Sequence, residues 1–132
     1  MEGEKRKILI VDDDNFLLDM YALKFSQNNF EVHTAGSGVQ AIEKLQGGLT
    51  PEVLLMDIIM PEMDGFEMLE KINQNNLSPN SVKIILSNKS QQSDIDRGNT
   101  LGVAGYIVKA NSTPAEVIEQ VINILSKKIV PK

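Results

Sequence analysis

The sequence alternates five times between a short apolar run and a longer segment whose apolar residues have helical spacing. The runs predict strands over residues 6–12, 30–35, 52–57, 82–87 and 103–108. The segments that follow them predict helices over residues 15–28, 37–46, 64–75, 90–101 and 113–126. Parallel strands need a crossover connection, which is usually a helix. Five strand–helix pairs therefore predict an α/β fold, a parallel sheet with helices on both faces.

The third apolar run carries a carboxylate, Asp57, within PEVLLMDIIMPEMDG (51–65). A charge inside an apolar run costs free energy unless it lies at the end of the strand or has a partner. Pro-Glu stands before and after the run, and this pattern is typical of a short strand buried on both faces of a parallel sheet. Asp57 would then lie at the carboxyl end of its strand, where open α/β sheets bind their ligands.

The composition excludes several classes of function. The 132 residues include no cysteine, which rules out disulfides, zinc–thiolate sites and a thiol nucleophile. The net charge of −5 argues against binding to nucleic acid, which needs a basic surface. The first apolar run is four residues long and ends in three aspartates, so it is no signal peptide, and no run approaches a membrane span. We therefore expect a cytoplasmic protein that binds neither nucleic acid nor membranes.

One domain is expected over residues 5–126, because no linker or repeat interrupts the alternation of strands and helices. Residues 127–132, KKIVPK, follow the last predicted helix and are expected to form a C-terminal tail. This leaves no segment for a DNA-binding or enzymatic output domain within the sequence. A complete stand-alone protein and a fragment of a longer one both remain open.

Polar residues stand at the carboxyl ends of four predicted strands: Asp12 and Asp13, Asp57, Ser87 and Lys109. Each residue type alone is common at a strand end, but strand ends at one edge of a parallel sheet lie close together, so these side chains should line one pocket. Clustered carboxylates repel one another, and Mg²⁺ with oxygen ligands would relieve the repulsion. A carboxylate can also be a nucleophile that forms an acyl phosphate, whose oxygens the lysine and the hydroxyl would contact.

The segments ILIVDDD, LLMDIIMPEMDG, IILS and GYIVK occur in this order along the chain. With these motifs the sequence resembles the receiver domain of bacterial two-component response regulators, of the chemotaxis-regulator type, from about Lys5 to Ser126. The resemblance implies a doubly wound, flavodoxin-like sheet of five parallel strands in the order 2-1-3-4-5, flanked by five helices. It also implies a signalling switch that works in a phosphorelay.

The resemblance assigns roles to the acidic residues. Asp57 would accept a phosphoryl group from a histidine kinase or a histidine phosphotransfer protein. Asp12 and Asp13 would bind Mg²⁺ together with Asp57 and the backbone carbonyl of Ile59. Asp14 lies beyond the metal-binding pair, so we expect it to cap the first helix.

The resemblance also implies how the switch responds. Ser87 and Lys109 would contact the phosphoryl oxygens, and Tyr106 would change rotamer as the Ser87 hydroxyl moves inward. Phosphorylation would then alter the surface formed by the fourth helix, the fifth strand and the fifth helix, within residues 90–125, which would bind a downstream protein. The protein is not expected to be an enzyme beyond its own phosphotransfer and slow dephosphorylation.

Two positions depart from the family pattern. The family usually has a proline joined by a cis bond after the lysine, where this sequence has Ala110. A cis bond to a residue other than proline costs about 2.5–4 kcal/mol, so we expect either a trans bond with a shifted loop or a strained cis bond.

The family usually has Ala or Gly after the hydroxyl, where this sequence has Asn88. Asn88, with Ile59 and Lys89, is expected to narrow the pocket entrance and slow phosphoryl transfer or hydrolysis.

Three other functions fit part of the sequence. GSGVQA (36–41) matches a dinucleotide-binding fingerprint, with Asp57 at the distance of a ribose contact, which would indicate a flavodoxin-like nucleotide- or flavin-binding protein. That function would leave Asp12, Asp13 and Lys109 without a role. A phosphohydrolase would need a second aspartate where Ile59 stands. A receiver fold used only for binding, without phosphorylation, is the remaining alternative.

Overall fold

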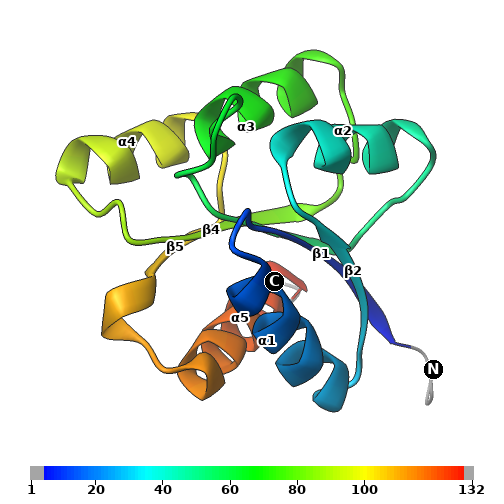
Figure 1. Cartoon of the computed structure of the whole chain (residues 1–132), viewed down its shortest axis with the longest axis vertical. Helices are drawn as coiled ribbons and strands as arrows, with labels where there is room; N and C mark the ends of the chain where they lie inside the picture. Colours follow the sequence, from blue (N-terminus) through cyan, green and yellow to red (C-terminus); the bar gives the residue numbers. More distant parts are fainter. Residues whose placement is uncertain (1–4, 130–132) are drawn as a thin grey trace.

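Five parallel strands form one sheet in the order β2-β1-β3-β4-β5, so the predicted fold class and strand order are confirmed (Figure 1). The structure, a computed structural model, describes residues 5–129. The strands are β1 (Arg6–Val11), β2 (Phe30–Ala35), β3 (Val53–Met56), β4 (Val82–Ser87) and β5 (Gly105–Val108). β3 is buried at every residue, whereas β2 at the edge of the sheet is buried only at its two ends. A central strand covered on both faces needs a continuous apolar run, and this explains VLLM.

Helices cover both faces of the sheet (Figure 1). The helices are α1 (Asn15–Gln27), α2 (Gly38–Gln46), α3 (Gly65–Gln74), α4 (Gln92–Thr100) and α5 (Pro114–Ile129). One apolar core lies between the sheet and the pair α1 and α5, where the rings of Phe25 and Phe30 meet edge to face at 5.1 Å. The other core lies between the sheet and the helices α2, α3 and α4. Each strand therefore buries alternate side chains in opposite cores.

The strand register sets which strand ends meet. Val11 at the end of β1 is paired with Met56 at the end of β3, and Ser87 at the end of β4 with Val108 at the end of β5. The residues that follow Val11 and Met56 therefore leave the sheet side by side. This register places the expected site at one edge of the sheet.

The N-terminus of α2 has half of a capping box, the pattern that Ser37 followed by Gln40 favours. The Ser37 hydroxyl accepts the Gln40 backbone N–H at 3.1 Å. The Gln40 side chain, however, accepts the N–H of Gly36 at 2.8 Å rather than that of Ser37, so the reciprocal bond is missing. The box at Asp64 and Glu67, which begins α3, is formed in both directions.

α5 begins as predicted but ends later. The Thr113 hydroxyl accepts the Glu116 N–H at 3.2 Å, and the Glu116 carboxylate accepts the Thr113 N–H at 2.8 Å. The helix continues to Ile129, so the first three residues of the expected tail, 127–129, are helical, and residues 130–132 lie outside the described part. Across residues 5–129, no helix is both long and apolar enough to cross a membrane.

α4 is shorter than predicted and is held to α3 largely through polar contacts. The Arg97 guanidinium lies 3.2 Å from the Glu70 carboxylate and 4.6 Å from the centre of the Phe66 ring. The Asn73 side chain donates a hydrogen bond of 3.0 Å to the carbonyl of Leu101, just after α4. Each such surface contact contributes about 1 kcal/mol or less, so α4 is more weakly anchored than an element docked by a large apolar face.

Candidate functional site

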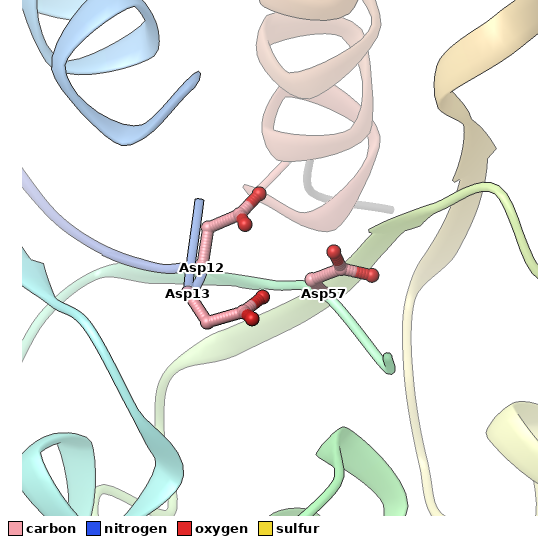
Figure 2. Close-up of side chains that lie close together, drawn as sticks. All are labelled: Asp12, Asp13 and Asp57. Atoms are coloured by element: carbon pink, nitrogen blue, oxygen red, sulfur yellow. The ribbon is translucent and has the colours of Figure 1, made fainter. Parts of the chain in front are cut away.

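The three carboxylates that follow β1 and β3 gather at one point. Asp12 and Asp13 leave β1 next to Asp57, which follows β3 (Figure 2). One carboxylate oxygen of each residue lies within 4.8 Å of the others. Asp12 and Asp57 are only 3% and 7% exposed, whereas Asp13 is exposed at the mouth of the cluster. Like charges this close need a neutralising partner.

Lys109 supplies that partner from the end of β5. Its ammonium Nζ donates to Asp12 Oδ2 at 2.7 Å and to Asp57 Oδ2 at 2.9 Å. Burial alone would lower the pKa of Lys109, but its hydrogen bonds to Asp12 and Asp57 raise the pKa above its ordinary value. Burial raises the pKa of Asp12, against the lowering by Lys109. The lysine is therefore charged and bridges the two buried carboxylates.

Backbone donors fix the orientation of both buried carboxylates. Asp57 Oδ1 accepts the N–H of Ile58 at 2.7 Å and that of Ile59 at 3.2 Å. Asp12 Oδ1 accepts the N–H of Asp14 at 2.9 Å. These contacts were not foreseen, although the tendency of Asp to bond to the backbone two residues on was a signal for them. Each carboxylate thus presents one oxygen to the chain and the other to Lys109.

Asp14 stands outside the cluster. Its carboxylate accepts the Leu17 N–H at 3.1 Å and caps α1, as predicted. The donor set at the site is then Asp12, Asp13 and Asp57, all hard oxygen ligands of the kind that Mg²⁺ prefers. These residues fit the ion. The expected contribution of the Ile59 carbonyl stays a prediction.

Ser87 and Tyr106 both contact the backbone of Lys89 in the connection between β4 and α4. Ser87 Oγ, fully buried, accepts the Lys89 N–H at 3.3 Å. The Tyr106 hydroxyl donates to the Lys89 carbonyl. Burial, with the nearby charges of Asp94 and Asp57, raises the pKa of Tyr106 to about 12, so its hydroxyl is protonated at neutral pH. Two side chains expected to act in the switch therefore hold the same short segment.

The bond between Lys109 and Ala110 is trans, since no peptide bond between described residues is cis. Lys109–Asn111 form a single 3₁₀ turn, and the lysine still reaches both carboxylates. The trans alternative of the prediction is therefore the correct one. The backbone N–H of Ala110, which a proline would lack, donates to Asn88 Oδ1 at 2.8 Å. Both departures from the family pattern meet in this hydrogen bond, which the sequence did not indicate.

A hollow of about 220 Å³ opens next to the residues that follow Asp57, lined by Ile58, Ile59, Met60, Asp64 and Lys89. The Ile59 side chain is 58% exposed there. A larger hollow of about 430 Å³ lies at the other edge of the sheet, among residues that precede or begin β1, β3 and β4. The strand register separates it from the carboxylates, so the smaller hollow is the one relevant to the site.

Three of the six backbone N–H groups of the fingerprint segment 36–41 are already bonded within the segment. The N–H of Gly36 is bonded to the Gln40 side chain, and the N–H of Gln40 to the Ser37 hydroxyl. The N–H of Ala41 donates to the Ser37 carbonyl at 3.1 Å. A dinucleotide site would need such donors for the pyrophosphate, and these three are not free to bind one.

The model of one protein family, the response regulator receiver domain, matches residues 8–122. The chain belongs to this family. The receiver domain is 29% identical over 122 residues to the alkaline phosphatase synthesis transcriptional regulatory protein PhoP of Bacillus subtilis, covering 92% of this chain and 49% of that protein. It is 31% identical over 121 residues to the transcriptional regulatory protein SrrA of Staphylococcus aureus, covering 92% and 48%. It spans about half the length of these curated relatives.

Solved structures give the same fold. A CheY-like response regulator receiver domain protein from Methanospirillum hungatei superposes with a TM-score of 0.84 at 27% identity, over 94% of this chain and 96% of that one. The chemotaxis protein CheY4 of Vibrio cholerae also gives 0.84, at 24% identity, over 92% and 99%, and supports the fold alone. The receiver domain thus has near full-length structural counterparts.

Proposed function

We propose that this receiver domain is an Mg²⁺-dependent phosphoacceptor switch of a two-component phosphorelay. Asp57 would accept a phosphoryl group from a histidine kinase or a histidine phosphotransfer protein. The observation that carries the proposal is the Lys109 ammonium that bridges Asp12 and Asp57 within the group of three carboxylates. A buried cation beside a carboxylate nucleophile is what transfer of an anionic phosphoryl group needs.

The transfer would proceed by attack of an Asp57 carboxylate oxygen on the phosphorus of the donor's phosphohistidine. A new O–P bond forms, the N–P bond breaks, and its electron pair stays on the imidazole nitrogen of the donor. Lys109 and the N–H groups of Ile58 and Ile59 already contact the carboxylate and are placed to contact the phosphoryl oxygens. Mg²⁺, when held by Asp12, Asp13 and Asp57, supplies further positive charge to those oxygens.

The response would pass through the segment at Lys89. A phosphoryl oxygen on Asp57 would attract the Ser87 hydroxyl, which now accepts the Lys89 N–H. Movement of this segment would change the hydrogen bond between Tyr106 and Lys89 and the position of α4. The weak anchoring of α4 supports a change of packing there. The surface of α4, β5 and α5 would then bind the downstream protein.

The output surface can be tested by amide hydrogen exchange with Mg²⁺ and beryllofluoride, a phosphoryl mimic. We expect severalfold altered exchange in α4 and β5 and little change in β2, because only the former contact the Lys89 segment. Mg²⁺ alone serves as the control. Equal changes across the whole sheet, or none in α4, would contradict this surface.

We also propose that the protein is not an enzyme that acts on a separate substrate. Its only turnover would be its own phosphotransfer and the slow hydrolysis of the acyl phosphate. The net charge of −5 supports a function without nucleic acid or an anionic membrane surface. A location in the cytoplasm is part of the same proposal.

Intact-mass measurement after incubation with acetyl phosphate tests the proposed function. We expect one added phosphoryl group on the wild type with Mg²⁺, and none without Mg²⁺ or on Asp57→Asn. Asp19→Asn, which removes an exposed carboxylate of α1, should be modified like the wild type. If no adduct formed under any condition while calorimetry showed Mg²⁺ binding, the phosphoacceptor role would be wrong. The alternative of a receiver fold used only for binding would then be favoured.

A further inference from the structure

One hydrogen bond joins the two chain segments that leave β4 and β5 above the site. Ser87 and Val108 are paired at the ends of these strands, so Asn88 and Lys109 are the next residues of neighbouring strands. Asn88 Oδ1 accepts the N–H of Ala110 at 2.8 Å. Ala110 is bonded directly to Lys109, so this contact fixes the backbone of the lysine from its C-terminal side.

Lys109 is held at two places in the unphosphorylated state, at its ammonium and at its backbone. Its Nζ is held by the carboxylates of Asp12 and Asp57, and its backbone by the Ala110 bond and by the turn in which the Ser112 N–H donates to the Lys109 carbonyl at 3.3 Å. During phosphoryl transfer the Asp57 carboxylate becomes the nucleophile, so the ammonium must release it and follow the phosphoryl oxygens. At that moment the backbone anchor decides where the lysine can reach.

We propose that Asn88 is a positioning residue for Lys109, acting through the Ala110 N–H. The proposal rests on the proposed function, because it concerns the phosphoryl transfer to Asp57. Asn88 follows Ser87 in the chain, so the same side chain also ties the segment that senses the phosphoryl group to the lysine that contacts it. Substitution of Asn88 should therefore act on the rate of transfer more than on the resting fold.

Three measurable quantities separate this role from a merely structural one: the stability, the Mg²⁺ affinity and the rate of phosphorylation. Asn88 and Ala110 are both exposed, so loss of their bond leaves no buried group without a partner and should cost little stability. Within the described residues, the side-chain hydrogen bond of Asn88 goes to Ala110 and not to the carboxylates that would hold Mg²⁺, so the Mg²⁺ affinity should not change. The rate of Asp57 phosphorylation should fall, since an interaction that matters in the transition state changes the rate.

The test compares Asn88→Ala with Asn111→Ala, which truncates an exposed asparagine of the same connection that has no hydrogen bond through its side chain. The initial rate of phosphorylation by acetyl phosphate is followed by intact mass, the Mg²⁺ affinity by calorimetry and the unfolding midpoint by circular dichroism in urea. We expect Asn88→Ala to be about three- to tenfold slower, with the other two quantities within experimental error of the wild type. Asn111→Ala should match the wild type in all three.

Ala110→Pro removes the N–H donor and completes the comparison. If the bond carries the effect, adding Asn88→Ala to Ala110→Pro should change the rate by less than twofold. Asn88→Asp, which keeps an acceptor oxygen at the same place, should be faster than Asn88→Ala and gives a second measure should the proline variant not fold.

A faster Asn88→Ala would overturn the positioning role and favour the expectation that Asn88 narrows the pocket entrance. An unchanged rate, with the wild type phosphorylated on Asp57, would overturn the positioning role alone. Absence of any adduct on the wild type would overturn the proposed function together with it.

Discussion

Replacing Lys109 with Met is expected to slow phosphorylation of Asp57 at least about a hundredfold, because the substitution removes a preorganised donor to the phosphoryl oxygens. The same variant should bind Mg²⁺ about tenfold more tightly, which corresponds to about 1.4 kcal/mol. The reason is competition, since Lys109 Nζ now occupies Asp12 Oδ2 at 2.7 Å and Asp57 Oδ2 at 2.9 Å. Tighter metal binding with slower transfer is a combination that damage to the fold would not produce.

The same substitution should also lower stability in the absence of metal. The side chains of Lys109, Asp12 and Asp57 are 10%, 5% and 9% exposed, so the carboxylates would lose their partner in a largely buried place. Removing one member of a buried ion pair typically costs about 3–5 kcal/mol, and we expect about 3 kcal/mol here because Asp13 is open to water. Saturating Mg²⁺ should restore most of the lost stability, because the ion replaces the missing positive charge.

Urea unfolding with and without Mg²⁺, calorimetry and intact mass together check this prediction. Lys71→Met removes an equal charge from an exposed position on α3 and should change none of the three quantities. A Lys109→Met variant that is phosphorylated at the wild-type rate would contradict the role of the ammonium. A Lys109→Met variant with a lower Mg²⁺ affinity than the wild type would contradict the competition between the ammonium and the ion.

The sequence predicted the sheet and the site cluster well because both follow from strand order. In a parallel sheet the strand ends are neighbours by construction, so Asp12 and Asp57 had to meet once β1 and β3 were adjacent. Lys109 follows β5, which is two strands from β3 and three from β1, and it reaches both carboxylates only because its side chain is long. The backbone contacts at Asp57 and the bond between Asn88 and Ala110 could not be predicted in this way. They depend on the torsion angles of loops, which no apolar pattern specifies.

The end of α5 illustrates the same limit. The apolar stripe of the helix stops at Leu125, which is buried, and the chain beyond it is mostly polar. The helix nevertheless continues to Ile129, because a helix that has already formed can extend beyond its apolar stripe. Patterns therefore locate the buried part of an element better than its end.

Replacing Gly65 with Ala is expected to lower the free energy of unfolding by about 3 kcal/mol, at the upper end of ordinary overpacking. Gly65 is the first residue of α3, and its N–H donates to the Ile58 carbonyl at 2.9 Å. A Cβ at this position would lie 2.4 Å from the Asp57 carbonyl oxygen and 2.8 Å from the Ile58 Cα. Those atoms are backbone and cannot turn aside, so either α3 or the chain at Asp57 must move.

Because the added Cβ would press on the Asp57 backbone, Gly65→Ala should also slow phosphorylation, which separates it from a remote destabilising change. Gly36→Ala is the matched control, since its Cβ would meet only the Gln40 side chain, at 3.6 Å, an ordinary contact. We expect the control to change stability by less than about 1 kcal/mol and to leave phosphorylation unchanged. If Gly65→Ala were as stable and as readily phosphorylated as Gly36→Ala, then α3 and the Asp57 loop would yield to a methyl group. The close approach of the helix would then have no part in fixing the position of Asp57.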